Sequence, residues 1–331
     1  MKWQAIAGAS VLTAVASLAL RFTAQRDRID RSWLSDIGPK LSAIGEVDQL
    51  VITPLVERLV SSDRLLGEPG VSYLLQAGRT RLLFDSGFNR SGAARSALVR
   101  NAESLNVDLQ QLDGVVISHQ HADHVGGLRA AFRKSFAFSS DALEPHGLPA
   151  YVPTRMNHDR ADVVPTTGPR VIAEGVAVLP PLPAMMFWLG PLAEQALVVN
   201  VRGFGLVLIS GCGHPRIERM LAATERILDV PIKAVIGGLH LPVHPFGTPL
   251  LLQATLGNPN WPWQPVGERD VATAIQELAA RGPRMIGLSG HDSTPWTYAA
   301  FAAAFGTRYR TLRVGDEVVI RATTPQTIAA R

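Results

Sequence analysis

The chain has 331 residues, of which 47% are hydrophobic and 18% are charged, and its formal net charge is +4. This composition supports a large buried core and excludes an intrinsically disordered chain. Most of the positive excess lies in residues 1–31, so the rest of the chain does not predict nucleic-acid binding. The single cysteine, Cys212, excludes an intrachain disulfide.

The N-terminal segment predicts contact with a membrane. Residues 3–22 are mostly apolar or small, with no charge between Lys2 and Arg21, and about 20 such residues can cross a bilayer. We expect residues 1–24 to form an uncleaved single-pass membrane anchor, residues 25–48 a connector, and residues 49–331 a folded domain. The alternative is a cleavable signal peptide, which would make the domain secreted or periplasmic. The side of the membrane stays open, because Lys2 opposes the arginines on the other flank.

Short strands and helices alternate along the rest of the chain. Strands are expected at 51–55, 71–76, 81–84, 115–117, 151–152, 170–173, 176–179, 197–201, 206–209, 234–236, 285–288, 308–312 and 317–321, and helices at 91–105, 127–132, 216–228, 269–281 and 295–305. Two proline-rich stretches, 179–191 and 242–265, break this pattern. They predict either irregular surface loops or an apolar lid beside a site.

Four side chains that can bind a metal lie within six residues, directly after the apolar strand 115–117. They are His119, His121, Asp123 and His124. His119 and His121 alternate along one side of an extended segment, so both can face one ion. Asp123 and His124 follow where the chain turns into a helix, and they can hold a second ion. Neutral imidazoles and a carboxylate suit zinc, and also iron or manganese.

The pattern His-x-His-x-Asp-His after a hydrophobic strand, followed by Val125-Gly126-Gly127-Leu128, resembles the metallo-β-lactamase fold superfamily. The resemblance covers roughly residues 50–321. It implies an αββα four-layer sandwich, in which two mixed β-sheets pack face to face with helices outside. It also implies that His119 and His121 serve one metal site, that Asp123 and His124 serve another, and that a later histidine joins each site.

Three downstream histidines follow predicted strands. They lie in Gly211-Cys212-Gly213-His214, in Gly237-Gly238-Leu239-His240-Leu241 and in Gly290-His291-Asp292-Ser293. These stretches resemble one branch of the superfamily, the proteins related to dihydropterin ribofuranosylaminobenzene phosphate synthase. The last stretch departs from the pattern of that branch, which has a cysteine where this chain has Asp292. The resemblance implies that His214 and His291 complete the ligand set.

Four further residues have more than one interpretation. Asp85 follows a strand, and the resemblance implies that it fixes a ligand histidine. Glu194 is either an oxygen ligand or a loop residue, and His240 is either a ligand, a support for one or a substrate-binding group. Cys212 is a soft ligand, a bridging ligand or a small buried residue.

The leading expectation is a membrane-anchored, dinuclear metal-dependent hydrolase with two divalent ions, most simply zinc, with manganese or iron as alternatives. A metal-bridging hydroxide would attack an ester, thioester, lactone or phosphate-type bond in a small-molecule substrate, and Asp123 would handle the proton. A pterin-related phosphate transferase or synthase of the same fold is the alternative within this class. Redox chemistry at two irons and a non-catalytic, metal-stabilised binding module are the alternatives of other classes.

Overall fold

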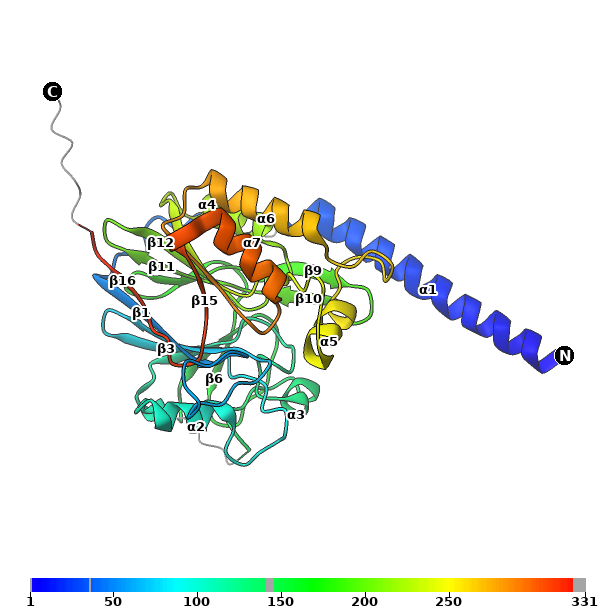
Figure 1. The fold of residues 1–331 in the computed structure, drawn as a ribbon, viewed down its shortest axis with the longest axis horizontal. Coiled ribbons are helices and arrows are strands. Elements are labelled where there is room, and N and C mark those ends of the chain that lie inside the picture. Colours follow the sequence, from blue (N-terminus) through cyan, green and yellow to red (C-terminus); the bar gives the residue numbers. More distant parts are fainter. Residues whose placement is uncertain (1, 36, 141–145, 324–331) are drawn as a thin grey trace, which may run out of the picture.

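Two seven-stranded sheets form the centre of the fold in the computed structural model, which describes residues 2–35, 37–140 and 146–323, with side chains from residue 16 on (Figure 1). The first sheet has the order β16 (Val318–Arg321), β1 (Gln49–Val56), β2 (Ser72–Ala77), β3 (Thr80–Phe84), β4 (Gly114–Val116), β5 (Pro149–Val152) and β6 (Asp162–Pro165). The second has the order β15 (Tyr309–Thr311), β14 (Met285–Leu288), β13 (Ile232–Gly237), β12 (Gly205–Ser210), β11 (Leu197–Val201), β8 (Val176–Val178) and β7 (Arg170–Ala173).

Each sheet is mixed, and its parallel half carries the loops that matter for function. Strands β3 to β6 run parallel in the first sheet, and strands β12 to β15 run parallel in the second. Parallel neighbours present their carboxyl ends at the same edge of a sheet, which is where sites form in α/β folds. The stretches that follow β4, β12, β13 and β14 are those that the sequence singled out.

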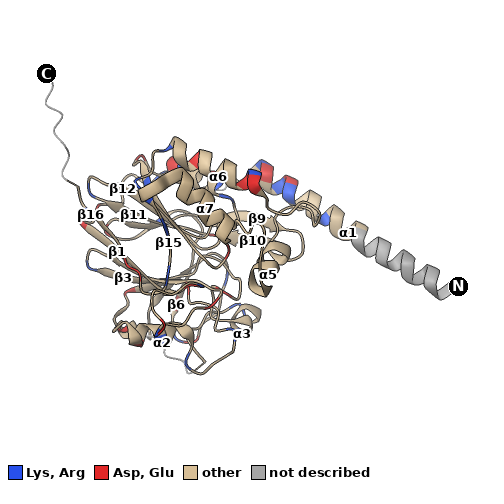
Figure 2. Cartoon of the chain, viewed as in Figure 1, with Lys and Arg blue, Asp and Glu red and all other residues tan. Residues whose placement is uncertain are grey.

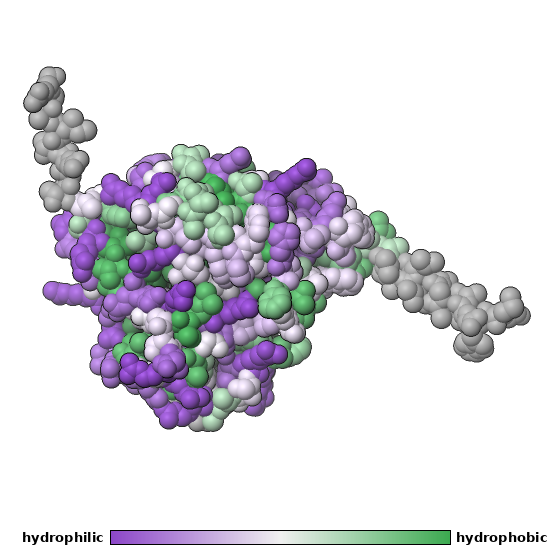
Figure 3. All heavy atoms as spheres, viewed as in Figure 1, coloured by the Kyte–Doolittle hydropathy of each residue, from purple (hydrophilic) through white to green (hydrophobic). Residues whose placement is uncertain are grey.

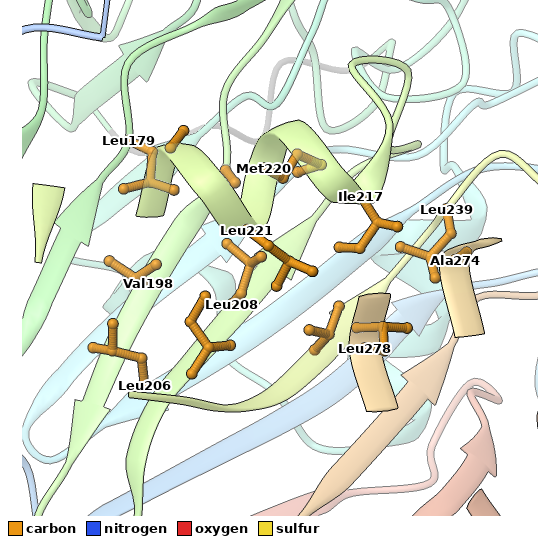
Figure 4. Close-up of a cluster of buried hydrophobic side chains, with 14 of the residues drawn as sticks. Leu179, Val198, Leu206, Leu208, Ile217, Met220, Leu221, Leu239, Ala274 and Leu278 are labelled. Carbon is orange, nitrogen blue, oxygen red and sulfur yellow. The ribbon is translucent and has the colours of Figure 1, made fainter. Parts of the chain in front are cut away.

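The core has three apolar layers. Leu197 and Val199 of β11 point toward the first sheet, whereas Val198, between them, points toward the helices, so the strand is buried on both faces. On the helix side, α4 (Ile217–Ile227) places Ile217, Met220 and Leu221 against Val198, Leu206 and Leu208 (Figure 4). Helices α6 (Glu268–Ala280) and α7 (Pro295–Phe305) complete this layer.

The other outer layer covers the first sheet. It contains α2 (Ala97–Ser104), the 3₁₀ turn η1 (Leu109–Gln111) and α3 (Leu128–Phe132), which pack on the far side of that sheet from the second one. A second 3₁₀ turn, η2 (Gly306–Arg308), follows α7. The order of helices, sheet, sheet and helices fits the four-layer sandwich that the resemblance implied.

The two proline-rich stretches contain regular structure. Residues 179–191 include β9 (Leu182–Met186), which pairs with β10 (Gly190–Glu194) in a separate two-stranded hairpin. Residues 242–265 include the short helix α5 (Thr248–Leu256). Helix α5 buries Leu250 and exposes Leu251, Leu252 and Leu256, and hydrophobic atoms gather on the surface over it (Figure 3).

Helix α1 (Lys2–Ser32) corrects the prediction of a membrane anchor. Among the described residues, no helix combines the length and the apolar character that a membrane span requires. The helix continues past the apolar run into a charged segment (Figure 2), and Phe22 is fully buried against Phe187 and Trp261. The predicted transmembrane helix and the single-pass localisation are therefore wrong.

Candidate metal centre

The loop after β4 is held by a buried carboxylate. Asp85, directly after β3, accepts hydrogen bonds from the backbone N–H and the hydroxyl of Ser118, both at 2.6 Å. Its Oδ2 also lies 2.7 Å from Nδ1 of His124, so this histidine directs its other nitrogen away from Asp85. Asp85 has a φ of 61°, a value that L-residues rarely adopt. Asp85 thus positions His124 rather than facing the centre itself.

A first group of three histidine nitrogens converges at this edge. Nδ1 of His121 lies 3.1 Å from Nε2 of His119 and 3.2 Å from Nε2 of His214. Burial lowers the pKa of His119 and His214 well below the ordinary value for histidine, which favours the neutral form of both rings. A proton on Nδ1 of His121 can form only one good hydrogen bond to the other two nitrogens. One cation shared by three lone pairs is the arrangement that satisfies all of them.

A second group lies beside the first and contains Asp123, His124, Cys212 and His291. The sulfur of Cys212 lies 3.1 Å from Nε2 of His124 and 3.1 Å from Nε2 of His291. Burial tends to lower the pKa of His124, but the carboxylates of Asp85 and Asp123 outweigh it and raise that pKa to about 9. The protein therefore stabilises a positive charge at this point.

The two groups offer nitrogen, sulfur and oxygen donors, the set that suits zinc, iron or manganese. Burial raises the pKa of the Cys212 thiol well above its ordinary value, and metal coordination is the usual means by which such a thiol loses its proton. The centre has an open side, since His121 and Asp123 are only half-buried. These features fit divalent ions that a small molecule can approach.

His240 stands at the edge of the first group. Its ring centroid lies 4.5 Å from that of His214. One of its ring nitrogens lies within 4.8 Å of the Cys212 sulfur and of a ring nitrogen of His214. The side chain is buried, and neither ring nitrogen has a hydrogen-bond partner among the described residues. Its backbone N–H donates to Oδ2 of Asp292 at 2.8 Å, which fixes the loop after β13. His240 is thus available for a ligand that the protein itself does not supply.

Glu194 supports the backbone of residues 212–214 and does not belong to either donor group. Its Oε1 accepts the backbone N–H groups of Cys212 at 3.0 Å and Gly213 at 2.8 Å, and its Oε2 accepts that of His214 at 2.8 Å. Both carboxylate oxygens are therefore already used. Burial raises the pKa of Glu194 to about 7, although the hydrogen bonds from Gly213 and His214 oppose this.

Two supporting residues were missed from the sequence. Glu57, after β1, accepts hydrogen bonds from the hydroxyl of Ser289 and from the backbone N–H of Gly290 at 3.0 Å, and Ser289 contacts Nδ1 of His291 at 2.6 Å. Gln253 on α5 donates from Nε2 to Oδ2 of Asp123 at 2.9 Å. A lone acid shortly after the expected strand 51–55 was the available signal for Glu57, whereas Gln253 had none.

Comparisons with known proteins test the two resemblances that the sequence showed. Residues 65–162 match the family model described as the metallo-beta-lactamase superfamily. The chain is 25% identical over 249 residues, covering 61% of this chain and 81% of the relative, to 7,8-dihydropterin-6-methyl-4-(beta-D-ribofuranosyl)-aminobenzene-5'-phosphate synthase of Methanocaldococcus jannaschii. Both resemblances seen in the sequence are thereby confirmed.

Two solved structures share the fold. One is Tm1679, described as a metal-dependent hydrolase of the beta-lactamase superfamily, with a TM-score of 0.56 and 19% identity over 82% of this chain and 99% of that one. The other is the metallo-beta-lactamase fold protein YhfI from Bacillus subtilis, with a TM-score of 0.51 and 15% identity over 81% of this chain and 99% of that one. At these identities, the likeness is one of fold.

Proposed function

We propose that this chain, which has the fold of the metallo-β-lactamase superfamily, is a metal-dependent hydrolase of small molecules. The observation that carries the proposal is the pair of adjacent donor groups, with Cys212 between them and with the half-buried His121 and Asp123 on the side nearer solvent. In the proposed enzyme, His119, His121 and His214 hold one ion, and Asp123, His124, Cys212 and His291 hold the other. His240 faces the substrate or serves as a further ligand.

The substrate bond is of the ester, thioester, lactone or phosphate type. When bound, a pair of divalent ions supplies a water nucleophile of lowered pKa and stabilises the negative charge that develops on the substrate. Asp123 is the group through which the proton passes, since its carboxylate lies at the open side and Gln253 fixes one of its oxygens. Asp85, Glu57 and Glu194 keep the ligand loops rigid.

A transferase or synthase that acts on a pterin-linked phosphate is the second candidate. It is favoured by the synthase relative, because the matched region spans 81% of that protein. The departure at Asp292 weighs against an identical substrate, since this residue supports the loop that carries His240. A non-catalytic binding module is disfavoured because the donor groups have an open side.

A substrate panel tests the proposal. Protein loaded separately with zinc, manganese or iron is assayed against a nitrophenyl ester, a bis-nitrophenyl phosphate, a thioester and a lactone. We expect turnover of at least one substrate, its loss with a chelator and its recovery when metal returns. His121→Ala should abolish turnover, and His146→Ala, at an exposed loop histidine, should not. Turnover that survives both the chelator and His121→Ala would contradict the proposal.

A further inference from the structure

A cavity of about 160 Å³ lies beside the two donor groups and shares His214 with the first of them. Its walls come from the second half of α1, from β9 and from the loop that leads into α4. Its charged wall residues are Arg26, Arg216 and Arg219, with Asp30 as the opposing acid. Three guanidinium groups against one carboxylate leave a positive excess within a small space that adjoins the candidate metal centre.

Helix α1 is fixed so that Arg26 faces this cavity. Phe22, one helical turn earlier, is buried with its ring centroid 5.2 Å from that of Phe187 and 5.1 Å from that of Trp261. The guanidinium carbon of Arg26 lies 5.8 Å from the centroid of the Phe22 ring. These contacts explain why the charged half of α1 lies against the body of the protein (Figure 2).

Arg219, on the wall opposite α1, is also constrained. Arg219 pairs with Asp30 of α1, and its guanidinium carbon lies 5.4 Å from the ring centroid of Trp33. Arg26 shares the same aspartate, with Nε 3.9 Å from Oδ2. Because one carboxylate serves two guanidinium groups, both arginines keep N–H donors for a further anion.

Arg216 is the residue just before α4, and its backbone is strained. It has a φ of 73°, and no side chain caps the start of the helix. Strained residues persist where the surrounding structure holds them, often at ligand sites. The N-terminus of α4 adds a partial positive charge to the same wall. His214, which also lines the cavity, is buried, and its Nδ1 has no hydrogen-bond partner among the described residues.

We propose that this cavity binds the phosphate group of a small-molecule substrate while the reactive bond reaches past His214 to the donor groups. The inference rests on the proposed function and deepens it by naming the substrate class. The positive excess and the helix N-terminus match a dianionic tetrahedral group better than a single carboxylate. Guanidinium forks also recognise phosphate through paired hydrogen bonds.

Inorganic phosphate is the probe for this site, titrated by calorimetry into metal-loaded protein at constant ionic strength. We expect Arg216→Ala and Arg219→Gln each to weaken binding by about ten- to hundredfold, since each removes charge-assisted hydrogen bonds. Arg28→Ala, at an exposed position on α1, should leave the affinity unchanged. Arg216 is itself exposed, so its replacement does not endanger the fold. Equal affinity in wild type, Arg216→Ala and Arg219→Gln would overturn the proposal.

His121→Ala, which removes a donor of the first group, tests whether phosphate binds at that ion instead of in the cavity. The proposal expects phosphate binding to persist in His121→Ala, and its loss there with no effect of the arginine variants would overturn it. Acetate that binds as tightly as phosphate would also overturn it. Failure of the proposed function has a different signature, namely arginine-dependent phosphate binding in a chain that shows no metal-dependent turnover.

Discussion

Replacing Glu194 with glutamine tests how the protein holds its ligand loops. The substitution keeps the size of the side chain but replaces one carboxylate oxygen with an NH₂ group, which cannot accept a hydrogen bond. The carbonyl oxygen of the glutamine can serve either the pair Cys212 and Gly213 or His214 alone, but not both sets. At least one buried backbone N–H in this loop therefore loses its acceptor.

The expected cost follows from these contacts. A buried donor left without an acceptor costs about 1–3 kcal/mol, and hydrogen bonds to charged groups lie toward the upper end. We expect Glu194→Gln to lower the free energy of unfolding by about 2 kcal/mol and Glu194→Ala by more, since alanine leaves three N–H groups unpaired. Because His214 moves with the loop, metal affinity at the first group should fall by about ten- to hundredfold.

Urea denaturation in a chelator measures the stability, and competition with a metal-binding dye measures the affinity. Asp113→Asn is the matched control, because Asp113 also accepts a backbone N–H, that of Arg81 at 2.8 Å, but at the opposite end of β4. The control should leave metal affinity unchanged. Wild-type stability and metal affinity in Glu194→Gln would refute the idea that this carboxylate organises the ligand loop.

Three further predictions concern other supports. Phe22→Ala should lower the free energy of unfolding by about 3–5 kcal/mol in urea denaturation, because Phe22 is fully buried; an unchanged midpoint would show that α1 does not pack on the body. Asp292→Asn should cost about 1–3 kcal/mol in the same assay, since Oδ2 accepts the N–H of His240; no change would mean that the contact contributes nothing. Gln253→Ala should lower kcat about tenfold without loss of metal, and lost metal would instead assign Gln253 to the ion site.

The sequence predicted most of the sheets because their strands are short apolar runs bounded by turns. The predicted first and last residues of the elements were less accurate. The helix expected at 91–105 begins only at Ala97, because the hydroxyl of Ser96 accepts the N–H of Val99 and caps it there. Helix α5 was missed because prolines surround it and three of its four leucines face outward, so no amphipathic period marks it.

The candidate centre was predictable where ligands are close in sequence or follow strands. The structure brings His119, His121, Asp123, His124, His214 and His291 together with Cys212. Their roles as ligands remain a prediction. The supports were harder to find, since Glu57 and Gln253 act across long stretches of chain that only the fold brings together.

The membrane anchor was mispredicted for a related reason. An apolar composition indicates that a segment buries its surface, but it does not tell whether lipid or the rest of the protein covers that surface. Within residues 16–32, the apolar side chains pack against hairpin β9–β10 and the loop around Trp261. Phe22 lies at the middle of this contact, between Phe187 and Trp261. The same packing brings Arg26 to the cavity beside His214, which gives this half of the helix a place beside the candidate site.

Metal content measured on the purified chain tests the central claim most directly. Elemental analysis of metal-replete wild type should give about two equivalents per chain, and His121→Ala should retain about one, because His121 belongs to only the first group. One equivalent or fewer in the wild type, or an unchanged content in His121→Ala, would contradict the account of two adjacent ion sites.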